Sequence, residues 1–489
     1  MIDWRQKMNR SNLLGKRLAT LNDDHPRFET IQDDGRGLSS EEIENLNKRV
    51  REKLNKAFGE EIHKRRNEED FRLLMYKTIE AILKEEDFQI GSLEKSKFVT
   101  DLLNDILGFG PIQPLVDDES ITEIMVVGPN RVYIEQNGVL IPTDIKFASK
   151  RQVQLLIDKI IGPLGRRCDE STPNVDARLP DGSRVSASIH PIALDGPYIT
   201  IRKFAKKTFT LDDYVRLGSC SPEMAHFIES AVKGKLNIVV SGGTGSGKTT
   251  LLNCVSSYID PSERILTIED SAELQLTQPH VERYEARPAN VEGKGAITIR
   301  DLVIYALRKR PDRIVVGEIR GGEAMDMLQA MNTGHDGSLT TGHANSPKQM
   351  INRLETMALM SGMEIPVKAI RETIAGAVHL IIQIGRLKDG SRKIVAITEV
   401  VGIGRDGAEK LGIQKYDKEA VYLQDIFKFI QTGTGENGKV EGVFAATGYK
   451  PMCLEKFESY GITLDESMFE RTLVESGNQN PFPKASKEV

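Results

Sequence analysis

Apolar residues recur at helical spacing over the first hundred residues. Ser39 and Glu42 fit a capping box, so a first helix is expected to begin there. A second helix follows it, and a third is expected over 94–107. The first two apolar stripes consist of Ile43, Leu46, Val50 and Leu54, and of Phe71, Leu74, Thr78 and Ile82. Such helices either form a small bundle or stay solvated and pack only against neighbouring subunits.

The pattern changes at Gly108–Pro111, where glycine and proline end the third helix. Short apolar runs then predict strands, and Asn137-Gly138 between two of them is a strong hairpin signal. The predicted strands are 122–127, 132–136, 139–141, 184–190 and 198–202, with one helix over 152–161. The region therefore predicts a mixed α/β domain that ends near residue 210.

From Leu211 onwards, short apolar runs alternate with helical patterns. This alternation predicts a mostly parallel sheet covered by helices. The runs are 237–240, 265–268, 314–316 and 338–341, and a later hairpin is expected from 380–384 and 393–401. The stretch from Gly442 is predicted to be helical and polar.

Composition sets the expected number of domains and argues against some classes of protein. With 489 residues, of which 39% are hydrophobic, about three domains of roughly 150 residues are expected. The formal net charge of -5 does not suit an overall basic nucleic-acid binder, so no nucleic acid is expected as a partner. The four cysteines are scattered and form no C-x-x-C pair, which argues against zinc and disulfides.

The order of these patterns along the chain predicts its organisation. No uninterrupted run of about 20 apolar residues is present, so no membrane span is expected. The N-terminus lacks the apolar core of a signal peptide, and a cytoplasmic location is expected. The predicted segments are a flexible arm (1–38), a helical N-terminal bundle (39–100), a mixed α/β N-terminal domain (101–210), a phosphate-loop α/β domain (211–441) and a polar C-terminal tail (442–489).

The run Ser241–Thr250 carries the strongest chemical signal. Gly242, Gly247, Lys248 and Thr249 match the phosphate-binding pattern G-x-x-x-x-G-K-[ST], between a predicted strand and a predicted helix. Lys248 is the expected cation for the β- and γ-phosphates, and Thr249 is the expected Mg²⁺ ligand. The expected ligands are therefore ATP and Mg²⁺. The predicted nucleotide-binding residues are Gly242, Gly243, Thr244, Gly245, Ser246, Gly247, Lys248, Thr249 and Thr250.

Acidic residues follow two of the predicted strands. Glu318 is expected to contact Mg²⁺ through water, because its arm is longer than that of aspartate; the alternative is a surface acid. At the other strand end, Glu269 and Glu273 are candidates for the base that polarises the attacking water. The alternative there is a helix N-terminus, capped by Asp270 with Glu273 as its capping-box partner.

Two Thr-Gly-His units end in His335 and His343, eight positions apart. A histidine in this context can sense the γ-phosphate or bridge to the next subunit. Metal binding is an alternative, although no third histidine or cysteine nearby completes a ligand set. An ordinary hydrogen-bonded histidine is the other alternative.

Together these motifs resemble those of the secretion ATPase superfamily, whose members power type II secretion, type IV pili and DNA-transfer type IV secretion. Its Walker A loop, acidic Asp box, Walker B strand and His box match Gly242–Thr249, Glu269–Glu273, Ile314–Glu318 and Thr333–His343. The similarity covers roughly residues 100–450. Within the superfamily the chain most resembles the tight-adherence (Flp) pilus ATPases, through Gly108–Ile112, Arg178–Val185, Ile199–Phe204 and Val316–Ala324.

The resemblance implies a fold, an assembly and partners. It implies a RecA-like P-loop ATPase domain, a PAS-like N-terminal α/β domain and a helical N-terminal extension, assembled as a homohexamer. It also implies a position at the inner face of the cytoplasmic membrane, where platform proteins couple the motor indirectly to pilin. The tetracysteine insertion of many type II members is absent, which favours the tight-adherence or DNA-transfer branch.

The resemblance further implies that arginines reach the γ-phosphate from the N-terminal α/β domain or from a neighbouring subunit. The candidates are Arg178, Arg184, Arg202, Arg308 and Arg320, and for each the alternative is a surface salt bridge. The expected function is a hexameric ATPase that drives tight-adherence pilus assembly. The alternatives are a DNA-transfer secretion ATPase, a nucleic-acid motor and an ATP-controlled scaffold.

Overall fold

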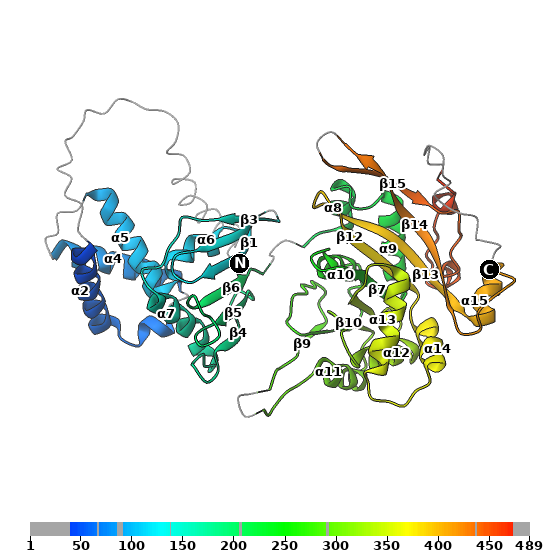
Figure 1. Ribbon diagram of the computed structural model, residues 1–489, viewed down its shortest axis with the longest axis horizontal. Helices are drawn as coiled ribbons and strands as arrows, with labels where there is room; N and C mark the ends of the chain where they lie inside the picture. The colour runs from blue at the N-terminus through cyan, green and yellow to red at the C-terminus, as the bar shows by residue number, and fades with distance from the viewer. Residues whose placement is uncertain are drawn as a thin grey trace, which may run out of the picture. The chain divides into compact units, whose positions relative to one another are not determined.

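The computed structural model describes residues 40–65, 68–85, 91–136, 138–204, 208–289, 293–435 and 438–472 (Figure 1). The predicted arm over 1–38 and the end of the chain after residue 472 lie outside these ranges. The chain divides into two compact units. The first comprises residues up to 119 with 128–132 and 143–159, and the second comprises 120–127, 133–142 and the residues from 160 onwards.

The first unit is built on helices whose apolar faces pack against one another. They are α2 (Ser40–Phe58), α3 (Glu61–Lys64), α4 (Glu69–Glu85), α5 (Ser92–Leu107) and α6 (Gln113–Asp117), with the short η2 (Gly110–Ile112) and most of α7 (Lys150–Ile161). Leu46, Val50 and Leu54 are fully buried as predicted, whereas Ile43 is 38% exposed. The helices α2 to α5 therefore share one apolar core.

The buried stripe of α4 differs from the predicted one. Phe71 and Ile82 are buried, but Leu74 is 44% exposed and its place in the core is taken by Met75 and Ile79. Phe71, Met75 and Ile79 follow one another at intervals of four residues, which keeps them on one face of the helix. The predicted stripe mixed two neighbouring faces.

The second unit contains a six-stranded sheet of order β3-β2-β1-β6-β5-β4. Its strands are β1 (Ile121–Val127), β2 (Val132–Gln136), β3 (Val139–Pro142), β4 (Asn174–Arg178), β5 (Arg184–Ser188) and β6 (Tyr198–Arg202), and η3 (Gly162–Leu164) precedes β4. The predicted hairpin is confirmed as the antiparallel pair β2 and β3. The strand β4 was not predicted. The PAS-like assignment of this region stays a prediction.

The same unit contains a nine-stranded sheet of order β15-β14-β13-β12-β7-β11-β10-β8-β9. Its strands are β7 (Ile238–Gly242), β8 (Ile265–Glu269), β9 (Val281–Glu285), β10 (Arg313–Val316), β11 (Leu339–His343), β12 (Leu380–Arg386), β13 (Arg392–Ile403), β14 (Val421–Thr434) and β15 (Val440–Ala446). The strands from β12 to β9 pair in parallel, and β13 to β15 are antiparallel. The predicted mostly parallel sheet is confirmed.

Helices cover both faces of this sheet (Figure 1). Every residue of β7 is buried; Ile238 and Val240 pack with α8, α9 and α10, whereas Val239 packs with α11 to α14. The helices are α8 (Leu211–Arg216), α9 (Pro222–Lys233), α10 (Lys248–Ser256), α11 (Ile299–Ala306), α12 (Glu323–Asn332), α13 (Pro347–Leu359), α14 (Val367–Ala377) and α15 (Gly404–Lys410), with the short η4 (Leu307–Lys309). None of the described helices, in either unit, combines the length and hydropathy that a membrane crossing requires.

The prediction of a polar tail from residue 442 is wrong for residues 442–472. The strand β15 continues the sheet, and α16 (Leu454–Ser459) and η5 (Glu466–Phe469) follow it. Phe457 and Phe469 pack on Phe227 of α9, with ring centroids 5.9 and 5.8 Å apart. Single aromatic residues in a polar stretch complete the core here, and such isolated positions carry no periodic signal.

Replacing Phe457 with alanine is expected to destabilise the second unit, because this ring is only 1% exposed in the core. Large-to-small changes at such positions cost about 3–5 kcal/mol. Urea unfolding measures the effect, with Tyr460→Ala as the matched control because Tyr460 is exposed. If Phe457→Ala unfolds like the control, the segment after β15 adds nothing to the core.

Candidate nucleotide-binding site

The phosphate loop is held in a sharp turn between β7 and α10. Gly242 ends β7, and a Cβ atom there would lie 2.4 Å from the carbonyl oxygen of Ile384, so no side chain fits. Gly245 and Gly247 have φ angles of +69° and +95°, a conformation that favours glycine. The loop leads directly into the N-terminus of the nine-residue helix α10, whose free N–H groups favour an anion.

Lys248 is the cation at the centre of this site. Its Nζ lies 3.1 Å from the carbonyl oxygen of Gly243 and 3.3 Å from Nδ1 of His343. Burial lowers the pKa of Lys248, although the nearby Glu318 opposes this shift. Within the described ranges no carboxylate forms an ion pair with the ammonium, so no acid competes directly with a phosphate for it.

His343 connects Lys248 to Glu318. Its Nε2 lies 2.7 Å from Oε1 of Glu318, and burial lowers the pKa of His343 below 6.5. The lowered pKa favours the neutral ring, and a ring nitrogen without a proton can accept from Lys248, whose Nζ lies 3.3 Å from Nδ1 and 3.4 Å from Nε2.

Glu318 is held from two sides. Besides His343, Nε of Arg320 donates to its Oε2 at 2.9 Å, and the side chain of Glu318 is only 18% exposed. Glu318 therefore lies in the site and not on the open surface. Since Arg320 occupies Oε2 and the ring of His343 stands 2.7 Å from Oε1, contact with a metal ion through water fits this carboxylate better than direct coordination.

Glu269 is buried at the end of β8, with 2% of the residue exposed. Its Oε2 accepts the backbone N–H groups of Glu273 at 2.7 Å and Leu274 at 3.0 Å. Burial raises the pKa of Glu269 to about 7, although these two hydrogen bonds oppose the shift. Glu269 thus fixes the backbone path towards Glu273. The alternative of a helix N-terminus is wrong, because residues 270–280 form no helix.

Glu273 lies in the same cavity and forms an ion pair with Arg184, with 3.3 Å between Oε1 and Nη2. Arg202 also lines the cavity. Arg178 instead pairs with Glu285 of β9 at 2.8 Å, beside the cavity. Of the arginines predicted from the first α/β region, Arg184 and Arg202 therefore reach the site directly.

Two predicted site residues lie away from the phosphate loop. His335 follows α12, where its backbone N–H and its Nδ1 each lie 3.3 Å from the carbonyl oxygen of Ala330. His335 precedes the five-residue strand β11 and His343 is its last residue, so the two lie at opposite ends of a strand about 16 Å long. Arg308 is exposed in η4, before β10 and thus at the opposite edge of the sheet. Within one chain, the prediction that these residues reach the nucleotide is wrong.

A cavity of about 370 Å³ collects the remaining groups at the carboxyl edge of the parallel strands, a volume typical of small-molecule sites. It is lined by Thr244, Gly245, Gly247, Lys248, Thr249, Thr250, Glu269, Asp270, Glu273, Glu318, Arg320 and His343, together with Gly182, Arg184, Arg202, Lys203, Phe204, Phe209, Asn253, Ser271, Gln275 and Gly317. Gly242, Gly243 and Ser246 shape the turn behind this surface, where Oγ of Ser246 donates to the carbonyl of Gly243 at 2.8 Å. A lysine, helix N–H groups, a threonine hydroxyl and carboxylates form a donor set that fits Mg·ATP.

The sequence motifs did not single out two arginines that adjoin the phosphate loop. Nε of Arg392 donates to the carbonyl of Gly245 at 3.1 Å, and Arg386 lies opposite Arg392 in the hairpin of β12 and β13. In the sequence, these two arginines are marked only by their positions on either side of the predicted turn. A turn prediction does not say which other loop the hairpin approaches, so their contact with the phosphate loop could not be predicted.

Glu269 is expected to make stability depend on pH. Its pKa is raised from 4.5 to about 7 in the folded state, so its stabilising contribution is complete below about pH 4.5 and is lost as the pH rises through about 7. Urea unfolding at about pH 5 and about pH 8 should show a loss of about 1–3 kcal/mol in the wild type that Glu269→Gln lacks. Parallel losses in the two proteins contradict the assignment.

Comparison with known proteins places the chain among secretion proteins. Residues 105–418 match the family described as Type II/IV secretion system protein. A Mycobacterium tuberculosis protein named as a conjugal transfer protein is 35% identical over 314 residues, which cover 63% of this chain and 89% of that protein. The conjugal transfer protein TrbB of Rhizobium radiobacter is 33% identical over 293 residues, covering 59% and 85%. The type IV secretion system protein VirB11 of Brucella suis is 30% identical over 301 residues, covering 56% and 83%.

Solved structures give similar matches. The VirB11 ATPase from the Brucella suis type IV secretion system, in complex with sulphate, is 28% identical; the match covers 59% of this chain and 94% of that one, with a TM-score of 0.33. The pilus retraction motor PilT with bound ADP is 19% identical, with coverage of 58% and 80% and a TM-score of 0.45. The family match over residues 105–418 spans more than half of this chain, and the chain therefore belongs to the Type II/IV secretion system protein family.

Proposed function

We propose that this chain is a magnesium-dependent ATP hydrolase that powers a conjugal-transfer type IV secretion apparatus. One observation carries the proposal: Lys248, His343 and Glu318 are linked at the mouth of the phosphate loop. A cation for the phosphates and a carboxylate for the metal are thereby joined through a neutral imidazole. Such a connection can transmit the presence of a γ-phosphate to the end of β10.

The residues divide the work of binding. The backbone of Gly242–Thr250 and the ammonium of Lys248 would hold the phosphates, while Thr249 and, through water, Glu318 would hold Mg²⁺. The metal ion, when bound, neutralises charge on the β- and γ-phosphates. Glu318 keeps its orientation because Arg320 holds its Oε2, while its Oε1 lies 2.7 Å from Nε2 of His343.

We assign the base to Glu273. The carboxylate of Glu269 is occupied by backbone N–H groups, so it positions the loop that carries Glu273. Glu273 lines the cavity and is paired with Arg184, which orients its carboxyl group towards the space where an attacking water would lie. Arg202, on the same wall, is suited to stabilise charge that develops on the γ-phosphate.

The choice of apparatus rests on the relatives. The curated relatives described above are named for conjugal transfer or type IV secretion, so a DNA-transfer system is favoured over the tight-adherence pilus expected from sequence motifs. One observation keeps pilus assembly as a second candidate. The helices α2 to α4 and most of α5 precede the family match at residue 105, and a helical N-terminal extension suits the tight-adherence branch.

The assembly and location are part of the same proposal. We infer a homohexamer at the inner face of the cytoplasmic membrane, bound to inner-membrane platform proteins of the apparatus. Hydrolysis in such a ring would bias a conformational change that the platform converts into work. Supply of Arg308 or His335 by a neighbouring copy would give a role to residues that lie away from the site within one chain.

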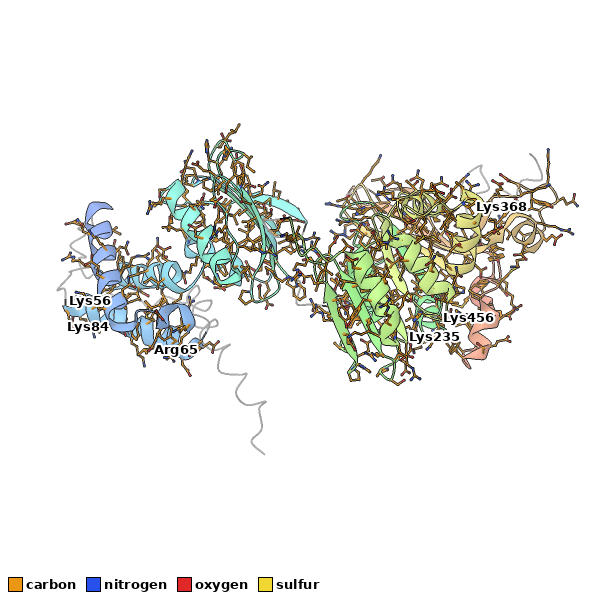
Figure 2. All side chains as sticks on the ribbon, turned by 90° about the horizontal axis from the view of Figure 1, so that it is seen from below. Lys56, Arg65, Lys84, Lys235, Lys368 and Lys456 are labelled. Atoms are coloured by element: carbon orange, nitrogen blue, oxygen red, sulfur yellow. The ribbon has the colours of Figure 1, made fainter. Side chains whose placement is uncertain are left out.

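ATPase assays on the purified protein test the chemical part. Lys248→Ala is expected to lose nucleotide binding, and Glu273→Gln is expected to lower kcat about 10²–10⁴-fold while ATP still binds, because only the base is removed. Lys368→Ala, at an exposed lysine of α14 (Figure 2), is the matched control and should behave as the wild type. A Glu273→Gln variant with full turnover contradicts the assigned base.

Complementation of a deletion strain tests the biological part. Wild type is expected to restore DNA transfer between cells, and Lys248→Ala is expected to fail although it accumulates normally, because transfer needs the bound nucleotide. Mating frequency and surface pilin are measured in parallel. Restored pilus fibres without any effect on DNA transfer would favour the tight-adherence candidate and overturn the conjugal one.

A further inference from the structure

The hairpin of β12 and β13 holds two arginines in directly opposite positions. Arg386 and Arg392 form a cross-strand pair of this antiparallel ladder, and both side chains are exposed. Like charges in such positions are destabilising. The described residues show no ion pair between either arginine and Asp389, the acid of the turn; its Oδ1 accepts from the N–H of Ser391 at 3.0 Å and its Oδ2 accepts from the N–H of Val440 at 2.8 Å. Over the ranges that the structure describes, neither arginine pairs with a carboxylate.

This arginine pair lies against the phosphate loop. Nε of Arg392 donates to the carbonyl of Gly245 at 3.1 Å, and a Cβ atom on Gly247 would lie 3.3 Å from Cδ of Arg392. Nη1 of Arg386 would lie 3.8 Å from a Cβ atom on Gly245. Both glycines line the cavity. Two positive charges without an acidic partner therefore adjoin the backbone that would carry phosphate.

We propose that Arg386 and Arg392 are positioning residues that raise the affinity of the phosphate loop for nucleoside diphosphates and triphosphates. The inference rests on the nucleotide binding proposed above. The negative charge of a bound polyphosphate offsets the repulsion between the two guanidinium groups. The hydrogen bond from Arg392 to Gly245 keeps the pair next to the loop, so this electrostatic stabilisation favours the nucleotide-bound state. Because the β-phosphate is present before and after hydrolysis, the pair strengthens ADP and ATP binding alike and leaves the chemical step unchanged.

Two other roles lead to different expectations. If Arg392 only supports the loop, its removal lowers the stability of the ligand-free protein and a change of nucleotide affinity is not required. If the pair docks on an acidic surface of another copy, its removal changes self-association at unchanged nucleotide affinity. The three roles therefore separate when affinity, ligand-free stability and oligomeric state are measured together.

Titration of the full-length protein with Mg·ADP tests the proposal. Arg386→Gln and Arg392→Gln are each expected to weaken ADP binding about 3- to 10-fold, with a larger loss in the double variant and a shallower dependence on salt. Arg386→Lys should retain most of the affinity because it keeps the charge. The ligand-free Tm should stay unchanged or rise, since repulsion is removed, and kcat at saturating ATP should change less than about twofold.

Arg405→Gln is the matched control, because Arg405 is an exposed arginine that forms an ion pair with Glu409 on its own helix, and its ADP affinity should match the wild type. The proposal is overturned if ADP affinity is unchanged in the double variant, or if kcat falls at unchanged affinity. It is also overturned if the ligand-free Tm of the variants falls and their ADP affinity returns to the wild-type value under conditions that stabilise the fold. Wild-type protein that binds no ADP would instead refute the proposed function itself.

Discussion

The parallel alignment of four strands creates the site. The strands β7, β11, β10 and β8 lie side by side and run in one direction, so their carboxyl ends meet at one edge of the sheet. His343 is in register with Gly242, and Val316 is in register with Ile268. Residues at or just after the ends of these strands, Glu269 and Glu318 among them, therefore share a cavity although long stretches of sequence separate them.

The lysine of the site contacts neutral groups, and the nearby carboxylates contact groups other than this lysine. Lys248 is held by a carbonyl and by a neutral imidazole, so its charge stays available to an anion. Glu318 pairs with Arg320 and lies beside His343, and burial raises the pKa of Glu269 to about 7. Less negative charge faces the phosphate loop than the count of acidic residues suggests, which is a condition for holding a polyanion.

The family match and the folded core do not end at the same residue. The match stops at 418, whereas β14 and β15 continue the sheet, and Phe427 of β14 and Phe457 of α16 join the core that contains β7. The two strands lie on the far side of β13 from the phosphate-loop strand. The antiparallel hairpin of β12 and β13 connects them to the loop, because it carries Arg392 at one end and pairs with β14 along its length.

The sequence by itself determined the strand–loop–helix unit, because Gly242–Thr249 form a local motif whose geometry depends on neighbours in the chain. It likewise determined the parallel sheet, since alternating strands and helices admit few arrangements. Only the tertiary structure decided which of two similar histidines faces Lys248, because strand direction places His343 at the carboxyl edge and His335 at the other. The same holds for Arg392, whose contact with Gly245 joins residues 147 positions apart. Periodicity and motifs report local order, whereas such contacts arise from the packing of distant elements and leave no pattern in the sequence.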